Sequence, residues 1–568
     1  MNRVFLSRIG DLCVGAVLAF ATSAEAAVPE PVRGERGAVA SRSMIASEVG
    51  LDILRAGGNA IDAAVATSFA LAVTWPSAGN LGGGGFMVIR LEDGTVITND
   101  HRETAPLAAT RDMYQDEDGA VIEGLSTHSH LAVGVPGSVA GMLDALERYG
   151  KLDRRAVIGP SIRLAREGFE LSYDQARDFA RVLLRMAPYA ASMAKFSREG
   201  APYAAGEVFR QPALARTLER IAEFGKAGFY EGETADLLVA EMERGGGLIT
   251  HDDLASYESV WREPIHGVYR GYEIWSMPPP SSGGLLLVQM LNMLEPFDLA
   301  GMGYGSAART HVMVEAERRA YADRAIHLGD SDFYPVPFQM LTDRDYAASR
   351  MENFDPKQAT RSSEIAAGAW PEENPDTTHL STMDAAGNAV AYTTTLNLSY
   401  GSKIVVAGAG FLLNNEMDDF SSKPGVPNAY GLLGADANAI APGKRMLSSM
   451  TPTIVTRDGE PWLVTGSPGG STIITTTMQV ILNSIDHQMS VNDAVGRPRF
   501  HHQWQPDQVW FEPLGLSPDT LSILRDMGHE MVSTPWGSDI GDANSIKRVD
   551  GEMRAMSDPR NDGGAAAF

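Results

Sequence analysis

Residues 376–415 read DTTHLSTMDAAGNAVAYTTTLNLSYGSKIVVAGAGFLLNN, and they predict a β-hairpin whose first strand begins with two threonines. The turn falls at residues 384–388, where Gly387 suits the positive φ that tight hairpin turns require. A hairpin symmetric about this turn places Thr377 opposite Thr395, and opposed residues lie roughly 5 Å apart. The pattern therefore predicts two threonine hydroxyl groups side by side at the open end of the hairpin.

Thr377 is a candidate nucleophile only if its own α-amino group is free. A threonine hydroxyl alone is a weak nucleophile, whereas an N-terminal threonine uses its α-amine as the base. This chemistry requires cleavage of the peptide bond between Asp376 and Thr377. The hairpin alone leaves a second interpretation open, in which the threonines simply border a polar strand.

Six further stretches, in fixed order along the chain, share one family resemblance: GLDILRAGGNAIDAAVATSFALAV (50–73), NLGGGGF (80–86), RETAP (102–106), LLNNEMDDFSSKPG (412–425), SSMTPTIV (448–455) and GSPGGS (466–471). From about Gly34 to its C-terminus, the chain resembles the γ-glutamyltransferases (γ-glutamyl transpeptidases), a family of N-terminal-nucleophile hydrolases. The resemblance implies an α+β fold, the αββα four-layer sandwich of that superfamily, formed jointly by both halves of the chain.

Helical periodicity and capping residues predict several elements outside the hairpin. Residues 44–72 predict two helices, with Asn59 capping the second. Another helix begins at Pro212, because proline is favoured in the first turn, and ends before Gly225. Residues 472–485 predict a further helix after the GSPGGS turn.

The stretch 355–376 is polar, lacks a clear period and is typical of an exposed linker. It leads directly to Thr377, so it suits a cleavage site between Asp376 and Thr377. The resemblance implies that residues 27–376 become a large subunit and residues 377–568 a small catalytic subunit. The two fragments of one precursor would then form a heterodimer.

Composition narrows the classes of function. The chain has 568 residues, of which 44% are hydrophobic, and this suits a large globular core. Its net charge of −25 repels phosphate backbones, so nucleic acid is an unfavourable partner. The only cysteine is Cys13, and a chain that loses it by processing has no catalytic thiol, disulfide or thiolate metal site.

The first 26 residues resemble a secretory signal peptide. Arg3 and Arg8 supply the positive start, residues 14–21 form an apolar run, and Ala24 and Ala26 frame a small-x-small cleavage pattern. A retained membrane anchor is the alternative, but the run is much shorter than the ~20 residues that a membrane-spanning helix needs. We expect an exported protein, periplasmic or secreted, without a stable membrane span.

The GSPGGS turn is a candidate oxyanion hole. It lies between a predicted strand and a predicted helix, where backbone N–H groups and the helix N-terminus favour negative charge. The local sequence also permits a plain tight turn. The family resemblance assigns the oxyanion role to the peptide N–H groups of Gly469 and Gly470.

The resemblance also implies a clamp for the head of an α-amino acid. Arg102 matches the group that binds the substrate α-carboxylate, which a guanidinium fits bidentately, and Asp419 matches the group that binds the α-ammonium. The other matched positions are Asn397, Glu416, Ser448 and Ser449. Some family members carry glutamine in place of Glu416. Such a clamp selects γ-glutamyl over α-glutamyl amides, because only the γ-amide leaves both α-groups free.

Residues 424–435 match a family segment that covers the glutamate pocket, and Tyr430 matches a tyrosine that hydrogen-bonds the residue equivalent to Asn397. This lid favours small substrates such as glutathione. Residues 80–85 lack the lysine of a phosphate loop and are interpreted as a close-packed backbone turn. The pairs His128 with His130 and His501 with His502 would each need a third ligand to bind a metal, so neither a metal nor a cofactor is expected.

The resulting hypothesis is a self-cleaving γ-glutamyltransferase and glutathione hydrolase, whose partners are γ-glutamyl donors and amino-acid or dipeptide acceptors. One alternative is a cephalosporin acylase of the same superfamily, which accepts a glutaryl group without an α-amino group. Arg102, Asn397 and Asp419 argue against that activity. The other alternative is a noncatalytic exported binding protein, against which the complete set of Thr377, Thr395 and the glycine pair argues.

Overall fold

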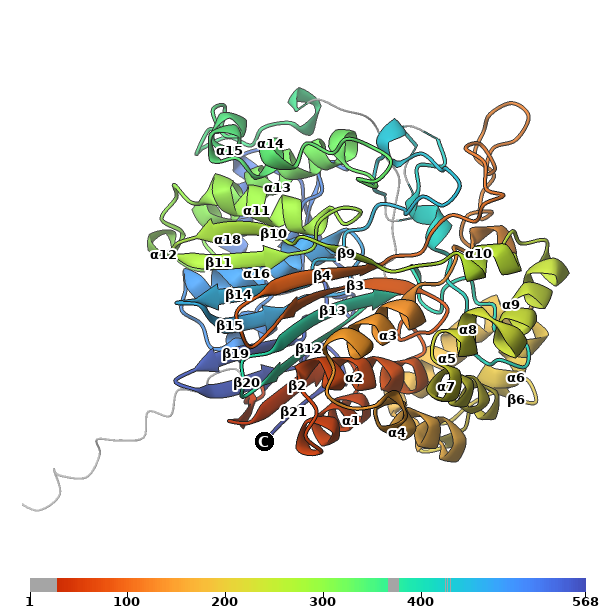
Figure 1. Cartoon of the computed structure of the whole chain (residues 1–568). Helices are drawn as coiled ribbons and strands as arrows, with labels where there is room; N and C mark the ends of the chain where they lie inside the picture. The colour runs from red at the N-terminus through yellow and green to blue at the C-terminus, as the bar shows by residue number, and fades with distance from the viewer. Residues whose placement is uncertain (1–27, 366–376, 424, 427, 430) are drawn as a thin grey trace, which may run out of the picture.

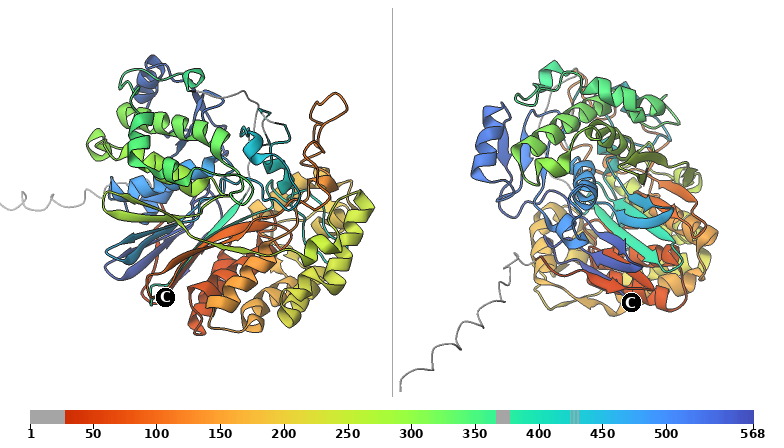
Figure 2. Two further views of the ribbon diagram at one scale, coloured as in Figure 1. Left: turned by 45° about the horizontal axis from the view of Figure 1, so that its top comes forward. Right: turned by 90° about the vertical axis from the view of Figure 1, so that its left-hand side faces the viewer.

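The computed structural model describes residues 28–365, 377–423, 425–426, 428–429 and 431–568. Two antiparallel seven-stranded sheets lie face to face, with helices on both outer faces (Figure 1). The turned views show the same order of layers (Figure 2). The predicted αββα sandwich is therefore confirmed.

The first sheet contains the predicted hairpin at its centre. Its strands are, in order, β21 (Gly564–Ala567), β2 (Gly37–Ser41), β12 (Thr378–Asp384), β13 (Ala389–Thr395), β3 (Gly84–Arg90), β4 (Val96–His101) and β9 (Val260–Arg262). Met383 is opposite Ala389 and Thr378 is opposite Thr394, as the symmetric hairpin predicts. Gly387 takes the positive φ of the turn, at 88°.

The second sheet has the strand order β1 (Val32–Gly34), β20 (Glu552–Met556), β19 (Ser545–Val549), β15 (Glu460–Thr465), β14 (Thr453–Arg457), β11 (Tyr272–Ser276) and β10 (Ile265–Tyr269). Both sheets interleave strands from before and after Thr377, so both halves of the chain build the fold. Between the sheets lies a buried apolar layer that includes Val88, Met383, Ile454, Val464 and Ile546.

Helices cover the outer face of each sheet because their apolar sides complete two further cores. The first sheet is covered by α1 (Met44–Arg55), α2 (Ala60–Thr74) and α3 (Ser138–Tyr149). The second is covered by α11 (Gly283–Leu294), α13 (Ala307–His327) and α16 (Thr472–Ile485). The predicted helix over residues 472–485 is confirmed at both ends.

A lobe of helices extends the first helical layer. Its helices are α4 (Arg154–Glu167), α5 (Tyr173–Met186), α6 (Ala190–Phe196), α7 (Pro212–Phe224), α8 (Ala227–Tyr230) and α9 (Gly232–Gly245). The predicted start of α7 at Pro212 is confirmed, and Gly225 ends it with a φ of 65°. Asn59 caps α2 through the backbone N–H groups of Ile61 and Asp62, also as predicted.

Of the exposed linker predicted for residues 355–376, the structure describes only the part up to Ile365. Some residues of this part are exposed, as predicted, and others are buried. Lys357 and Arg361 are exposed, but Ser362 and Ile365 are buried. The indole N–H of Trp504 donates to the carbonyl oxygens of both buried residues at 3.0 Å. This part of the segment therefore lies against a distant part of the chain, which its polar sequence did not indicate.

The predicted signal segment, residues 1–26, lies outside the described residues. Within the part of the chain that the structure describes, no helix combines the length and the apolar character needed to cross a membrane.

Candidate active site

Thr377 lies immediately before β12, and its side chain is buried beside that of Thr395 at the end of β13. The two hydroxyl oxygens are 3.4 Å apart. The backbone N–H of Asn397 donates to the Thr395 hydroxyl oxygen at 2.7 Å, and this fixes the orientation of the second hydroxyl. Asp376, the other predicted residue of the cleavage site, lies outside the described residues.

The two threonines open onto one pocket, where the structure brings together most of the residues predicted for the site. The pocket is lined by Arg102, Arg324, Thr377, Thr395, Glu416, Asp419, Leu432, Ser448, Ser449, Met450, Gly470 and Ile473. Its free volume is only about 20 Å³, which is room for about one water molecule. The side chains that line it therefore fill most of the space.

Arg102 is at the centre of an ion cluster in this pocket. Its guanidinium donates one hydrogen bond to Glu416 and another to Asp419. The side chains of Arg102 and Glu416 are almost fully buried, and that of Asp419 is 11% exposed. A third carboxylate oxygen, of Glu103, lies 3.7 Å from the same guanidinium. Burial opposes the charge of Arg102, but the three carboxylates outweigh it and raise the pKa of Arg102 above its ordinary value.

The carboxylates in turn have a raised affinity for protons. Burial raises the pKa of Glu103 to about 7 and raises the pKa of Glu416 and Asp419, against the opposing effect of Arg102. Mutual repulsion adds to the effect of burial. One arginine thus holds three crowded acids, and an added cation in the pocket would relieve their repulsion.

The predicted oxyanion loop follows β15 and leads into α16. Gly469 has a φ of 133° and Gly470 a φ of 55°, both in the region that favours glycine. A Cβ atom on Gly469 would lie 2.3 Å from the hydroxyl oxygen of Thr472. The carbonyl oxygen of Gly469 accepts hydrogen bonds from the backbone N–H and the hydroxyl of Thr472. The turn is thereby fixed at the N-terminus of α16, with Gly470 in the pocket wall.

Ser448 and Ser449 also line this pocket. The Ser449 hydroxyl oxygen accepts a hydrogen bond of 3.2 Å from Arg324, and Arg324 also donates to Ser282 at 3.0 Å. Burial lowers the pKa of Arg324 to about 10. Sequence reasoning missed this second arginine, because nothing in the sequence of α13 distinguishes it from its neighbours Arg318 and Arg319.

The glycine-rich stretch after Asn80 supports Thr395, as the interpretation of a close-packed turn predicts. The Asn80 amide donates to the Thr394 hydroxyl at 3.0 Å and to the Thr395 carbonyl at 2.8 Å. A Cβ atom on Gly83 would lie 2.0 Å from that same carbonyl oxygen. Only glycine lets the backbone approach the end of β13 so closely.

One predicted residue, Asn397, lies at the edge of the site. Asn397 has a φ of 73°, and its side-chain amide donates to the carbonyl of Asn415 at 2.9 Å, beside Glu416. Tyr430 lies outside the described residues. Of the predicted lid, Asn428 donates to Asp419 at 3.0 Å and Leu432 lines the pocket, so the described part of the lid contacts the clamp.

Within the described residues, one group of three side chains has the spacing of a metal site: His311, Glu315 and His529. The prediction of no metal did not consider them. His311 already bonds to His529 at 2.7 Å and to the carbonyl of Asp355 at 2.8 Å, and Glu315 accepts from Arg319. The group lies outside the pocket that contains Thr377.

The chain is similar in sequence and in structure to several known proteins. Residues 46–568 match the sequence profile of a family described as Gamma-glutamyltranspeptidase. A glutathione hydrolase proenzyme of Escherichia coli (strain K12) is 51% identical over 94% of this chain and 91% of its own length. The Helicobacter pylori gamma-glutamyltranspeptidase structure is 46% identical, with a TM-score of 0.57 over 57% of this chain and 93% of that chain. A cephalosporin acylase from Bacillus halodurans is 29% identical, with a TM-score of 0.84 over 95% of this chain and 97% of that chain.

Proposed function

The chain belongs to the gamma-glutamyltranspeptidase family, and from this premise we propose that it is the precursor of a glutathione hydrolase and γ-glutamyltransferase with Thr377 as its nucleophile. The precursor cuts itself between Asp376 and Thr377. Residues 27–376 become the large subunit and residues 377–568 the small subunit. Because strands of both fragments alternate within each sheet, the fragments stay together as a heterodimer.

The reaction uses groups that cleavage creates or leaves in place. The Thr377 hydroxyl attacks the carbonyl carbon of the γ-glutamyl amide, and the freed α-amine accepts its proton. The N–H groups of Gly469 and Gly470 stabilise the oxyanion of the tetrahedral intermediate. The α-amine then returns the proton to the leaving amine, and a γ-glutamyl ester remains on Thr377. Water or an acceptor amine releases the glutamyl group, so these steps need no cofactor.

Substrate recognition follows from the charges of the pocket. Arg102 binds the α-carboxylate and Asp419 the α-ammonium, with Asn397, Glu416, Ser448, Ser449 and Tyr430 completing the clamp. In the structure Arg102 is paired with Glu416 and Asp419, so the substrate carboxylate has to take the place of one partner. The substrate ammonium then compensates the carboxylate that Arg102 releases.

The observation that carries this function is the buried ion cluster beside the threonine pair. A glutaryl group has a carboxylate but no ammonium, so its binding would leave Asp419 without a compensating cation in a buried site, which is unfavourable. The cluster therefore favours a γ-glutamyl donor over the acylase alternative, although the fold is shared with a cephalosporin acylase.

The decisive assay compares donors and acceptors on the processed protein. We expect glutamate release from glutathione, and γ-glutamyl transfer when glycylglycine is added. Glutaryl-7-aminocephalosporanic acid serves as the matched donor without an α-amino group. Hydrolysis of this donor in preference to glutathione would support the acylase instead, and no turnover of either would support a noncatalytic protein.

Residues 1–26 further support export, to the periplasm or the medium, by their resemblance to a signal peptide. Fractionation of expressing cells tests this proposal, with a variant lacking residues 2–26 as the control. Retention of the full-length protein in the cytoplasm would contradict it.

A further inference from the structure

A second cavity, of about 300 Å³, lies in the helical lobe. It is formed by α6, by the start of α7 and by residues 405–410, a segment that follows Thr377 in the chain. The lining is Ala191, Ala194, Lys195, Tyr203, Arg210, Gln211, Pro212, Ala213, Leu214, Val405, Val406, Ala407, Gly408 and Gly410. No residue of this lining also lines the pocket of Thr377, so the two sites are distinct.

The charged side chains that line the cavity are all positive. Its walls are mostly apolar, two cations lie in the lining, and none of its described lining residues is acidic. This arrangement is unusual in a chain whose net charge is −25. Small-molecule sites are typically apolar cavities of roughly 300–1,000 Å³ with a few convergent polar groups, and this cavity fits that description.

The Lys195 ammonium has no acidic partner among the described residues that line the cavity. It donates to the carbonyl of Gly410 at 2.6 Å and lies 5.3 Å from the centre of the Phe196 ring. Among the described residues it forms no ion pair. Burial of the ammonium lowers the pKa of Lys195 to about 7, although the side chain as a whole is only half-buried. An ammonium has three donors, and a carboxylate would satisfy those that remain.

The neighbouring serine does not explain this lysine. Ser192 and Lys195 have the Ser-x-x-Lys spacing, but the Ser192 hydroxyl donates to the carbonyl of Lys403 at 2.7 Å and accepts from the N–H of Val405 at 3.0 Å. Ser192 thus holds the chain segment that forms the cavity wall. Lys195 is left at that wall without an acidic partner among the described residues.

We propose that this cavity binds a small organic acid with an unbranched apolar tail, its carboxylate paired with Lys195 and its tail against Leu214, Val405 and Val406. Charge complementarity selects the acid, because an amide or an amine of the same shape offers Lys195 no negative charge. The bound molecule contacts chain segments from both sides of Thr377, and no covalent chemistry is involved.

Calorimetric titration of the processed protein with hexanoate, at about pH 6, tests the proposal. Saturating L-glutamate is included so that the pocket containing Thr377 is occupied. We expect saturable binding of hexanoate and binding about tenfold weaker for hexanamide, the factor that loss of one charge-assisted hydrogen bond produces. Hexylammonium should not bind. Competition between hexanoate and L-glutamate, or equal affinity for hexanamide, would overturn the proposal.

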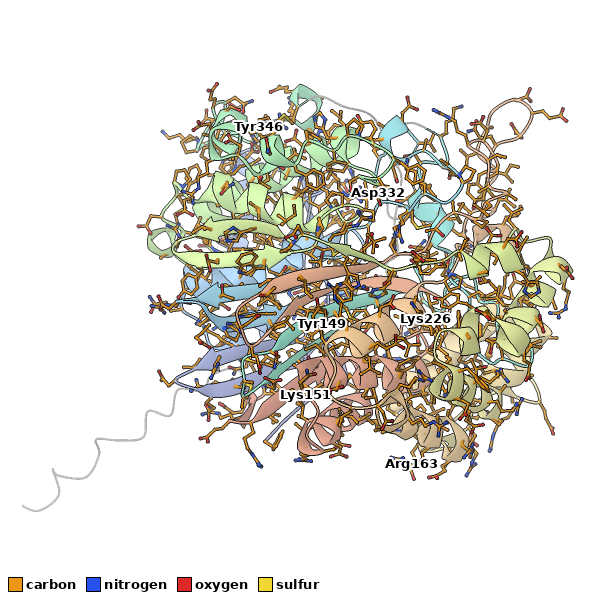
Figure 3. The ribbon with its side chains drawn as sticks, viewed as in Figure 1. Tyr149, Lys151, Arg163, Lys226, Asp332 and Tyr346 are labelled. Atoms are coloured by element: carbon orange, nitrogen blue, oxygen red, sulfur yellow. The ribbon has the colours of Figure 1, made fainter. Side chains whose placement is uncertain are left out.

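Variants locate the site. Lys195→Met should weaken hexanoate binding by about tenfold or more, and Lys195→Arg should retain most of it. The matched control is Lys226→Met at an exposed lysine that pairs with Asp144 (Figure 3). If Lys195→Met fails to fold, Ala194→Trp fills the cavity from its exposed rim and should abolish binding. Unchanged affinity in the folded Lys195→Met or Ala194→Trp variant would contradict the assignment.

Discussion

The hydroxyl oxygens of Thr377 and Thr395 lie 3.4 Å apart on neighbouring strands. Because the N–H of Asn397 already donates to the Thr395 oxygen, the hydrogen of that hydroxyl is available to Thr377. Thr395 is thus placed to orient Thr377, the proposed nucleophile, by a hydrogen bond.

The first prediction concerns removal of the Thr395 hydroxyl. Thr395→Ala should slow precursor cleavage and lower kcat on a γ-glutamyl anilide by about tenfold, which corresponds to one hydrogen bond. Thr395→Ser keeps the hydroxyl and should retain most of both rates. Gel densitometry of the precursor and initial rates of the processed enzyme measure the two effects. Equal loss in the serine and alanine variants would show that packing, not the hydroxyl, is responsible.

The second prediction concerns the buried ion cluster. Arg102→Ala leaves Glu416 and Asp419 without their cation, and breaking a buried ion pair costs about 3–5 kcal/mol of stability. Loss of the clamp should also weaken transition-state binding by about 2–5 kcal/mol, which is measured as a fall in kcat/KM. Glu416→Gln is the matched control, because glutamine can still accept from Arg102. Kinetics and thermal unfolding of both variants provide the measurements. An unchanged kcat/KM in the Arg102→Ala enzyme would contradict the proposed clamp.

The third prediction tests the oxyanion turn. Gly469→Ala introduces a Cβ atom that meets the Thr472 hydroxyl, so the N–H groups of the turn should shift. Loss of one oxyanion donor lowers kcat by about 100- to 1,000-fold. Gly459→Ala is the control, because Gly459 also has a positive φ, of 80°, but has no neighbour within 4 Å of an added Cβ. The outcome against this role is an equal kcat for the two variants.

The fourth prediction is a pH dependence of stability at Asp418. Burial raises the pKa of Asp418 from 3.8 to about 7, and the hydrogen bond from Ser126 opposes this only partly. Between about pH 4 and pH 7 the folded state therefore holds a proton that the unfolded chain has released. The resulting stabilisation, up to about 4 kcal/mol, is fully present below pH 4 and is lost as the pH rises through 7.

Asp418→Asn removes this titration, and its amide can still accept from the N–H of Ala429, as Asp418 does. The unfolding temperature of the wild type should fall more between pH 5 and pH 7.5 than that of the variant. Identical falls in the two proteins would assign the pH dependence to other groups.

Much of the fold could be predicted because its signals act over a few residues. Gly387 fixes the turn, and the turn then fixes the cross-strand pairs of β12 and β13. Continuing this register beyond Thr378 and Thr394 brings Thr377 beside Thr395. Asn59 and Pro212 mark helix starts by satisfying local backbone requirements. The buried part of the segment before the proposed cleavage site was not predictable, since it depends on Trp504, which is distant in the sequence.

The candidate site could likewise be predicted only in part from the sequence. The family resemblance supplied Arg102, Glu416 and Asp419, but not their mutual pairing. Arg324 was missed because its place opposite Ser449 depends on how α13 packs over the second sheet. A helical period alone does not decide which buried arginine faces a pocket.

The central claim is that Thr377 becomes an N-terminal nucleophile, and N-terminal sequencing of the purified protein tests it most directly. Denaturing electrophoresis should separate two fragments, with the smaller one beginning Thr377-Thr378-His379. The Thr377→Ala variant should remain a single uncut and inactive chain. A wild-type protein that hydrolyses glutathione at its full rate while still uncut would contradict the account.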